Sequence, residues 1–228
     1  MSPLDRTFLT DLPGVTTLLL IRHGQQQWPD QPDPTLADWG NGPLSDLGVR
    51  QAEAVAESLA GESIDAVYCS DLIRARDTAH QVGRHHGLVP VVVTGLREVE
   101  VFRDLPAESS IRGIMSDPVV IAAQERFVAE RRWDLYPFSE SSADCRHRVV
   151  GAIEEIVTAH RGRRVVVVCH SGVINAYLGH VLGLGQDMFF RPGHASVSRV
   201  LAGEGRRVLH SLNETHHLAR LDPALVTA

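Results

Sequence analysis

The sequence contains no lysine, and this absence narrows the chemistry open to it. All 22 basic residues are arginines, set against 28 acidic residues and a formal net charge of −6. The guanidinium of arginine is planar, always charged, and matches the oxygens of phosphate and carboxylate groups. The acidic balance gives no electrostatic reason to bind nucleic acid or an anionic membrane. We therefore expect neither as a partner.

Cysteine and long apolar runs are also scarce. Cys69, Cys145 and Cys169 form no CxxC pair and no zinc-type spacing. We interpret them as small buried side chains in a reducing compartment. No apolar run approaches the ~20 residues of a membrane-spanning helix, and residues 1–14 do not have the apolar core of a signal peptide. These features predict a cytoplasmic protein.

Two histidine pairs raise the question of a metal site. His85–His86 and His216–His217 are neighbours in the chain and do not have the i, i+4 spacing of helical metal ligands. We interpret both pairs as surface or structural residues. The sequence therefore predicts neither a metal site nor a cofactor.

Short apolar runs alternate with amphipathic stretches along most of the 228 residues. The apolar runs predict strands at 16–21, 64–69, 89–93, 164–169, 197–201 and 208–212. The amphipathic stretches predict helices at 46–59, 72–86, 119–132, 143–160 and 173–182. This alternation favours an α/β fold, a three-layer sandwich whose mostly parallel sheet carries helices on both faces. The run RVVVVC at 164–169 is apolar throughout and predicts a central strand.

Two stretches fall outside this alternation. Residues 25–43 are polar and include Pro29, Pro32 and Pro34, which predicts a loop. The period is lost again from residue 96 to about 142. We expect one domain spanning 1–228, with an insertion at about 99–142 forming a cap over the site. The insertion's arginines and tryptophan hint at a polar, sugar- or acid-bearing substrate, but a packed cap with solvated charges is an equal alternative; these residues are Arg103, Arg112, Arg126, Arg131, Arg132 and Trp133.

Polar clusters follow three of the predicted strands. They are Arg22-His23-Gly24, the segment from Ser70 to Arg74, and His170-Ser171-Gly172. Ligands of open α/β sheets bind beyond the carboxyl ends of the strands, so two histidines and two arginines are expected at one edge. Two guanidinium groups can hold phosphoryl oxygens. One imidazole can attack phosphorus while the other donates a hydrogen bond.

The segments that carry these clusters also resemble a known family. In chain order they are LLLIRHGQ at 18–25, PLSDLGVRQA at 43–52, YCSDLIRARDTA at 68–79, LRE at 96–98, VVVVCHSGVI at 165–174 and LNETHHL at 212–218. Together they resemble the histidine phosphatase superfamily, the phosphoglycerate-mutase-like proteins. One RHG tripeptide would be a weak signal, but these motifs occur in the family's order over most of the chain.

The resemblance implies a metal-independent phosphomonoesterase that acts on a small phosphorylated metabolite. His23 would be the nucleophile and form a phosphohistidine, and Arg22 and Arg74 would hold the phosphate. His170 would hydrogen-bond the phosphate and stabilise the transition state. Glu98 would be the general acid for the leaving oxygen and then the base for water. These roles are expectations carried over from the family's motifs.

The sequence departs from the family pattern beside the first histidine. The family often reads RHGxTxxN, and this chain has Gln26 and Pro29 at the last two polar positions. Gln26 can still donate an amide hydrogen, whereas proline offers no donor. The second-histidine segment reads HSG where the family often has HGG. We count Gln26 and Ser171 as further candidate phosphate-binding residues. Ser171 could also suggest a serine hydrolase, but it lacks the GxSxG motif of that class.

The acid segment departs as well. After LRE the chain continues VEVFRDLP, so Glu100 and Asp104 remain rivals to Glu98 as the proton donor. Arg76 could be a second phosphate ligand, but we favour an exposed helical charge.

Two alternative functions remain open. A cofactor-dependent phosphoglycerate mutase would need a long-lived phosphohistidine, and by resemblance such mutases use substrate contacts that include lysine. A non-catalytic phospho-ligand binder would fit the changes at Gln26 and Pro29. An edge strand at 208–212 could also pair across a homodimer.

Overall fold

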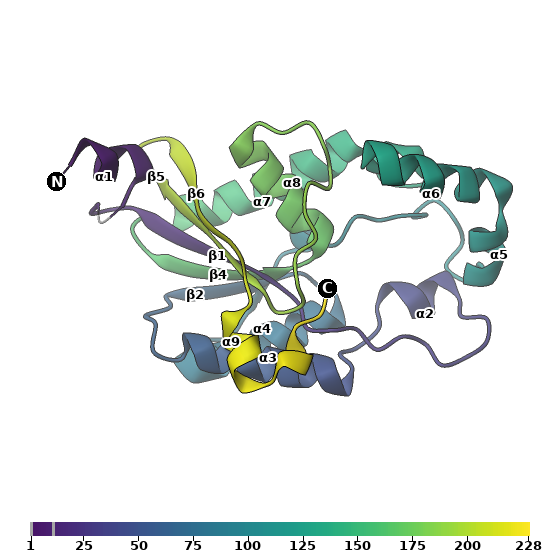
Figure 1. The fold of residues 1–228 in the computed structure, drawn as a ribbon, viewed down its shortest axis with the longest axis horizontal. Coiled ribbons are helices and arrows are strands. Elements are labelled where there is room, and N and C mark those ends of the chain that lie inside the picture. The colour runs from purple at the N-terminus through teal and green to yellow at the C-terminus, as the bar shows by residue number, and fades with distance from the viewer. Residues whose placement is uncertain (1, 11) are drawn as a thin grey trace.

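The computed structural model describes residues 2–10 and 12–228, which are built around one six-stranded sheet (Figure 1). The strand order is β3-β2-β4-β1-β5-β6. The first four strands in this order are parallel, β5 is antiparallel to β1, and β6 is antiparallel to β5. The strands are β1 Thr16–Arg22, β2 Ala66–Cys69, β3 Val91–Val92, β4 Arg164–Cys169, β5 Val197–Gly203 and β6 Arg206–Glu214. The predicted mostly parallel sheet is confirmed, with the RVVVVC strand between β2 and β1.

Helices cover both faces of this sheet, as predicted. In Figure 1, α7 and α8 lie above the sheet, and α3, α4 and α9 lie below it. The α-helices are α1 Pro3–Phe8, α2 Leu36–Gly40, α3 Asp46–Leu59, α4 Ile73–His86, α5 Ile111–Ser116, α6 Pro118–Glu130, α7 Ser142–Ala159, α8 Ser171–Leu182 and α9 His216–Leu221. Three short 3-10 helices are η1 Thr94–Leu96, η2 Trp133–Leu135 and η3 Pro223–Leu225.

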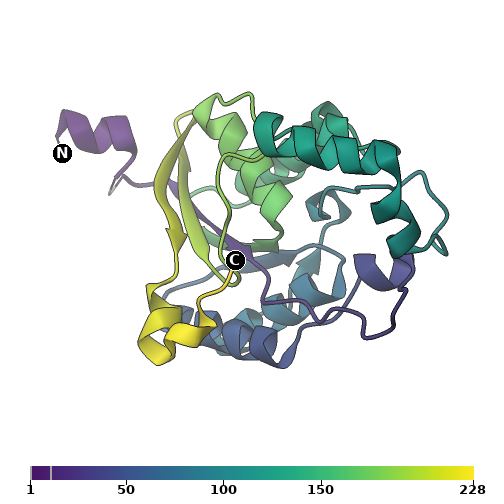
Figure 2. The same ribbon diagram turned by 45° about the vertical axis from the view of Figure 1, so that its right-hand side comes forward.

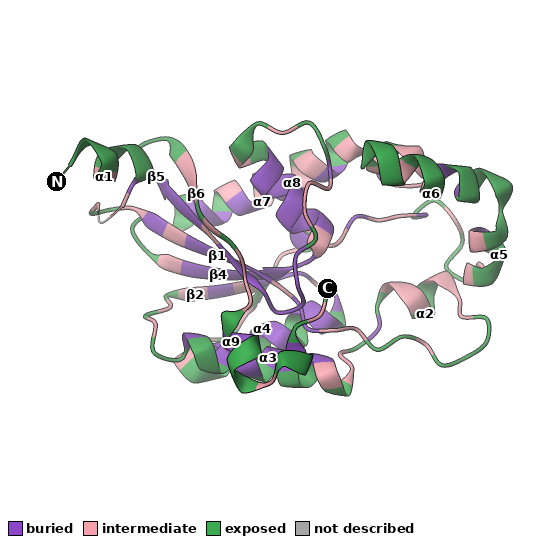
Figure 3. Ribbon diagram, in the orientation of Figure 1, coloured by how far each residue is buried: buried purple, intermediate pink, exposed green. Residues whose placement is uncertain are grey.

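The strand pleat divides the core into two apolar clusters. Successive side chains of a strand point to opposite faces. Leu18 and Leu20 of β1 accordingly pack against α7 and α8, whereas Leu19 and Ile21 pack against α3 and α4. The valines of β4 alternate in the same way. Continuous apolar runs, without polar alternation, are therefore what a strand buried on both faces requires, and Figure 3 shows the buried residues concentrated in the sheet and in α8.

Local signals set several helix ends. The Ser45 side chain accepts a hydrogen bond from the Gly48 backbone and begins α3, as a serine N-cap does. α4 ends at Gly87, whose φ of +65° is the left-handed conformation that glycine adopts without strain. α8 begins at Ser171, two residues before the predicted start, because His170 is its N-cap residue.

The largest differences lie in the short elements. The predicted strand at 89–93 is reduced to Val91–Val92, an exposed edge with two paired residues. α2 forms inside the segment predicted as a loop, and α1, α5 and α9 were not predicted. Each of these four helices has five or six residues, too few for a helical apolar period to be recognised.

The segment at about 99–142 lies at one end of the sheet, where α5 stands above α2 and α6 lies above both (Figure 2). Its buried residues Phe102, Ile114 and Val120 form a third apolar cluster, against which Leu36 of α2 packs. Backbone hydrogen bonds join residues 34–37 to residues 107–111. The polar segment after β1 and the insertion are thereby fixed to each other.

No helix in the described part of the chain is long and apolar enough to cross a membrane. Cys69, Cys145 and Cys169 are buried free thiols, as predicted.

Candidate active site

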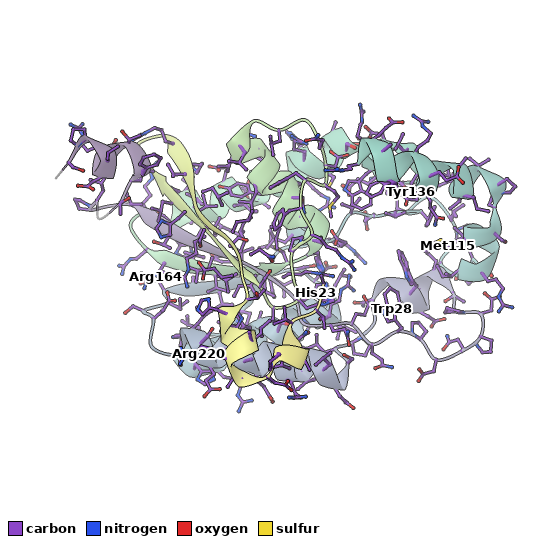
Figure 4. All side chains as sticks on the ribbon, in the orientation of Figure 1. His23, Trp28, Met115, Tyr136, Arg164 and Arg220 are labelled. Carbon is purple, nitrogen blue, oxygen red and sulfur yellow. The ribbon has the colours of Figure 1, made fainter. Side chains whose placement is uncertain are left out.

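A cleft of about 930 Å³ lies beyond the carboxyl ends of β1 and β2, between α2 and the insertion. His23 lies at its inner end, and Trp28 and the pair Met115 and Tyr136 lie on opposite sides of its opening (Figure 4). The lining residues lie within five stretches of chain that are distant in sequence, at 22–28, 36–41, 72–74, 97–136 and 191–194, together with Ala228.

His23 is held in one tautomer by its two hydrogen bonds. Its Nδ1 lies 2.6 Å from the Gly24 carbonyl oxygen, which can only accept, so Nδ1 carries the proton. Arg74 Nε donates to its Nε2 at 3.1 Å, so Nε2 carries a lone pair. Burial lowers the pKa of His23 well below its usual value, and His170, Arg74 and Arg22 lower it further. The imidazole is thus neutral, with its unprotonated nitrogen beside a guanidinium group.

Arg22 and Arg74 bring two guanidinium groups to this imidazole. Arg74 is buried and also donates to the Gly40 carbonyl at 2.9 Å. Arg22 donates Nη1 to the Pro192 carbonyl at 2.6 Å, and its buried Nε has no protein partner among the described residues. Burial lowers the pKa of Arg22 to about 10, so it remains charged at neutral pH. Both cations therefore keep donor capacity for an anion in the cleft.

His170 follows β4 and lies beside His23, with the two ring centroids 4.9 Å apart. It is fully buried, and neither ring nitrogen has a partner within the described chain. Burial, followed by Arg74 and Arg22, lowers its pKa well below the usual value. An imidazole buried without partners is costly. His170 does not itself line the cleft, so a phosphate oxygen would supply a partner when the group is seated against His23.

Glu98 contacts the start of α8, just after His170. Its Oε1 accepts hydrogen bonds from the backbone amides of Val99 at 2.9 Å and Gly172 at 3.0 Å. The carboxylate is therefore held at the N-terminal end of α8 and lines the cleft. Of its two rivals, Glu100 also lines the cleft and pairs with Arg97 at 3.4 Å, whereas Asp104 does not line it.

Two glycines of the motifs are required by close packing. A Cβ on Gly24 would lie 2.3 Å from the Gly48 carbonyl oxygen. A Cβ on Gly172 would lie 2.6 Å from Glu98 Oε1 and 2.5 Å from a methyl carbon of Val99. The HSG glycine thus makes room for the carboxylate.

The remaining sequence candidates are more distant from the chemistry. Gln26 lines the cleft, but its amide donates to the Trp39 carbonyl at 2.9 Å. Ser171 is the first residue of α8 and does not line the cleft. Arg76 is exposed on α4. Of the insertion's candidate substrate contacts, only Arg103 and Trp133 line the cleft.

His194 is a site residue that sequence reasoning missed. It is buried, lines the cleft, and its ring centroid lies 6.0 Å from that of His23. Its Nδ1 is 2.8 Å from the Thr227 hydroxyl. Burial, then Arg22 and Arg191, lowers its pKa to about 3, so it is a third neutral imidazole. It precedes β5, and because β5 is antiparallel to β1, the start of β5 meets the carboxyl end of β1.

Across the described residues, no group of three or more His, Cys, Asp or Glu side chains is placed to bind a metal ion. The polar groups that converge on the cleft are suited to an anion.

Comparison with known proteins gives consistent results. The family model of the histidine phosphatase superfamily, branch 1, matches residues 18–215. Phosphoserine phosphatase 1 of Hydrogenobacter thermophilus is 29% identical over 210 residues, covering 88% of this chain and 93% of that protein. A metal-independent phosphoserine phosphatase of Arabidopsis thaliana is 30% identical over 208 residues, covering 90% and 84%. The structure of a mycobacterial glucosyl-3-phosphoglycerate phosphatase superposes with a TM-score of 0.72 at 27% identity, covering 88% of this chain and 100% of that one.

Proposed function

The chain belongs to the histidine phosphatase superfamily, and on that premise we propose that it hydrolyses a small phosphorylated hydroxy or amino acid through a phosphohistidine on His23. The observation that carries the proposal is the state of His23: a neutral imidazole whose Nε2 lone pair faces a guanidinium group. A phosphatase nucleophile of this kind must be unprotonated and must have cations beside it to receive the phosphate.

In the first step, Nε2 of His23 attacks phosphorus. The N–P bond forms as the P–O bond to the alcohol breaks, and protonated Glu98 gives its proton to the departing oxygen. Arg22 and Arg74 hold the phosphoryl oxygens, and Arg74 Nε turns from His23 to the phosphate. His170 donates to an oxygen whose charge grows in the transition state.

In the second step, water attacks the phosphohistidine. The Glu98 carboxylate takes a proton from the water, the N–P bond breaks, and inorganic phosphate leaves. His23 returns to its neutral tautomer and Glu98 to its acid form. No metal is required, because the arginines and His170 supply the charge stabilisation.

The cleft supports an acidic leaving group. Five arginines and two glutamates line it, so its charge is positive beyond the pair that holds the phosphate. The other three are Arg97, Arg103 and Arg191. Each already has an acceptor: Arg97 pairs with Asp71 and Glu100, Arg103 with Asp104, and Arg191 donates to the Ala228 carbonyl oxygen. A second anion on the substrate would compete with these contacts for the guanidinium groups. Guanidinium groups bind carboxylates with good geometry. The relatives named above are phosphatases of phosphoserine and of glucosyl-3-phosphoglycerate.

The first experiment measures phosphate release from 4-nitrophenyl phosphate in excess chelator. The wild-type protein is expected to turn over, and His23→Ala is expected to lose activity by a factor on the order of 10⁴ or more. Release that required a divalent cation, or that survived in His23→Ala, would refute the proposal. Activity on 3-phosphoglycerate that depended on a bisphosphate and released no phosphate would indicate a mutase instead.

The substrate class is tested with a matched pair. 3-Phosphoglycerate and glycerol 3-phosphate differ in whether a carboxylate or a hydroxymethyl group is present. We expect kcat/KM to favour the carboxylate by ~10-fold or more, since a charge-assisted hydrogen bond contributes about 1.5–3 kcal/mol. Arg103→Gln or Arg191→Gln is expected to reduce that preference. Equal values for the two esters would exclude a carboxylate subsite.

A further inference from the structure

Arg148, in the middle of α7, donates to three backbone carbonyl groups of the segment that carries Glu98. Its Nη1 lies 3.0 Å from the Gly95 carbonyl oxygen and 2.7 Å from that of Arg97, and its Nη2 lies 3.2 Å from the carbonyl oxygen of Glu98. One guanidinium group therefore fixes the backbone on both sides of the proposed proton donor, including its own peptide.

A buried carboxylate holds this guanidinium in place. Glu140 accepts from Nε and from Nη2 of Arg148, each at 2.6 Å, in a two-pronged ion pair. The Glu140 side chain is 3% exposed. Bidentate pairs of this type fix the geometry as well as the charge. Arg148 therefore has little freedom to release the carbonyl groups.

Glu140 also lies where the two ends of the insertion meet. Its backbone amide donates to the Glu100 carbonyl at 3.0 Å, and the Phe102 amide donates to the Ser139 hydroxyl at 3.0 Å. The two ends of the insertion thus meet beside Arg148. The segment from 95 to 100 is held from α7 on one side and from the end of the insertion on the other.

We propose that the Arg148–Glu140 pair is a positioning device that places the Glu98 carboxyl group at the leaving-group oxygen. Neither residue lines the cleft, and their contacts with the acid segment are to its backbone, so the pair acts through that backbone. This inference rests on the proposed function, in which Glu98 protonates the leaving alcohol. Misplacement of a catalytic group by ~1 Å can cost on the order of 10² in rate.

The dependence on leaving group separates this role from a general structural one. An alkoxide needs a proton to leave, whereas nitrophenolate leaves without one. Loss of acid positioning therefore slows alkyl esters selectively, but a loosened phosphate site slows both classes equally. The quantity to compare is kcat/KM, because it includes transfer to His23 and excludes the later hydrolysis of the phosphohistidine.

The main test is Arg148→Lys, which keeps the positive charge beside Glu140 but removes the three carbonyl contacts. We expect kcat/KM for 3-phosphoglycerate to fall ~10- to 100-fold, the range found for residues that orient a functional group, with 4-nitrophenyl phosphate close to unchanged. Arg146→Lys is the matched control. Arg146 lies on the same helix and binds the Leu184 and Gln186 carbonyl groups at 2.7 Å and 3.3 Å, away from the acid segment. It is expected to affect neither ester.

Glu140→Gln provides a second variant if Arg148→Lys does not fold. It keeps the side-chain shape and weakens the ion pair, so we expect a smaller fall in kcat/KM that is again selective for 3-phosphoglycerate. Glu98→Gln is the reference, with a larger selective loss. Equal losses on both esters, or none, in folded Arg148→Lys or Glu140→Gln would overturn the inference if Glu98→Gln remains selective. If Glu98→Gln itself shows no selectivity, the proton-donor assignment fails, and the positioning proposal fails with it.

Discussion

His194→Asn is predicted to destabilise the protein at pH 7 and to stabilise it at pH 5. Histidine has a pKa of about 6.5 in an unfolded chain, and burial lowers that of His194 to about 3 in the folded protein. Below pH 6.5 the unfolded state binds a proton that the folded state does not, so acid destabilises the fold. At pH 5, which is about 1.5 pH units below the pKa of the unfolded state, this proton uptake lowers the free energy of unfolding by ~2 kcal/mol. Near pH 7 it almost vanishes.

Asparagine does not titrate, and its side chain can still reach the Thr227 hydroxyl that His194 contacts at 2.8 Å. It fills less volume than the imidazole, which costs ~1 kcal/mol at every pH. The variant is therefore expected to be ~1 kcal/mol less stable than the wild type at pH 7 and ~1 kcal/mol more stable at pH 5. Urea unfolding at the two pH values measures both differences.

A neutral core variant controls for other effects of acid. Val197→Ala, three residues further along the chain, removes buried apolar atoms without a titrating group, so its destabilisation should be the same at both pH values. A pH-independent difference for His194→Asn would refute the reasoning, because it would mean that His194 binds its proton equally in the folded and unfolded states.

Three further substitutions test the site. Arg74→Lys keeps a charge but loses the planar fork, so kcat/KM for 4-nitrophenyl phosphate should fall on the order of 10²-fold; a change of less than about threefold would contradict the role. Gly172→Ala places a Cβ 2.6 Å from Glu98 Oε1 and should slow 3-phosphoglycerate by ~10²-fold with little change for the nitrophenyl ester. Gly24→Ala would set a Cβ 2.3 Å from the Gly48 carbonyl oxygen and should lower the unfolding free energy by ~1–3 kcal/mol in urea; an unchanged midpoint would show that the backbone there can move.

The sheet was predictable where the strands are buried on both faces. β1 and β4 are uninterrupted apolar runs, and no helical period competes with that pattern. At the sheet edge the pattern overstated the strand: Val89 and Val91 are exposed, and only two residues of β3 pair with β2. The valine-rich sequence there reflects local preference without burial, which a single sequence cannot distinguish from a buried strand.

The site also contains residues that the sequence indicated and residues that it did not. The sequence indicated the arginines and histidines that directly follow parallel strands, because the carboxyl ends of those strands meet at one edge. It did not indicate His194, which precedes a strand. That position reaches the same edge only because β5 is antiparallel to β1, and strand direction depends on pairings that the local pattern does not encode. The contacts of Arg148 were hidden for a similar reason, since they join segments about 50 residues apart.

The neutral imidazoles and the affinity for an anion have one physical origin. Burial and the charges of Arg22 and Arg74 keep His23 and His170 unprotonated in the free protein. The same burial leaves both nitrogens of His170 without partners among the described residues and places the charges of the two arginines away from water. A phosphate group relieves both costs, because its oxygens accept hydrogen bonds and its charge offsets the arginines. The arrangement that keeps His23 unprotonated is therefore also one that favours the binding of a phosphate group.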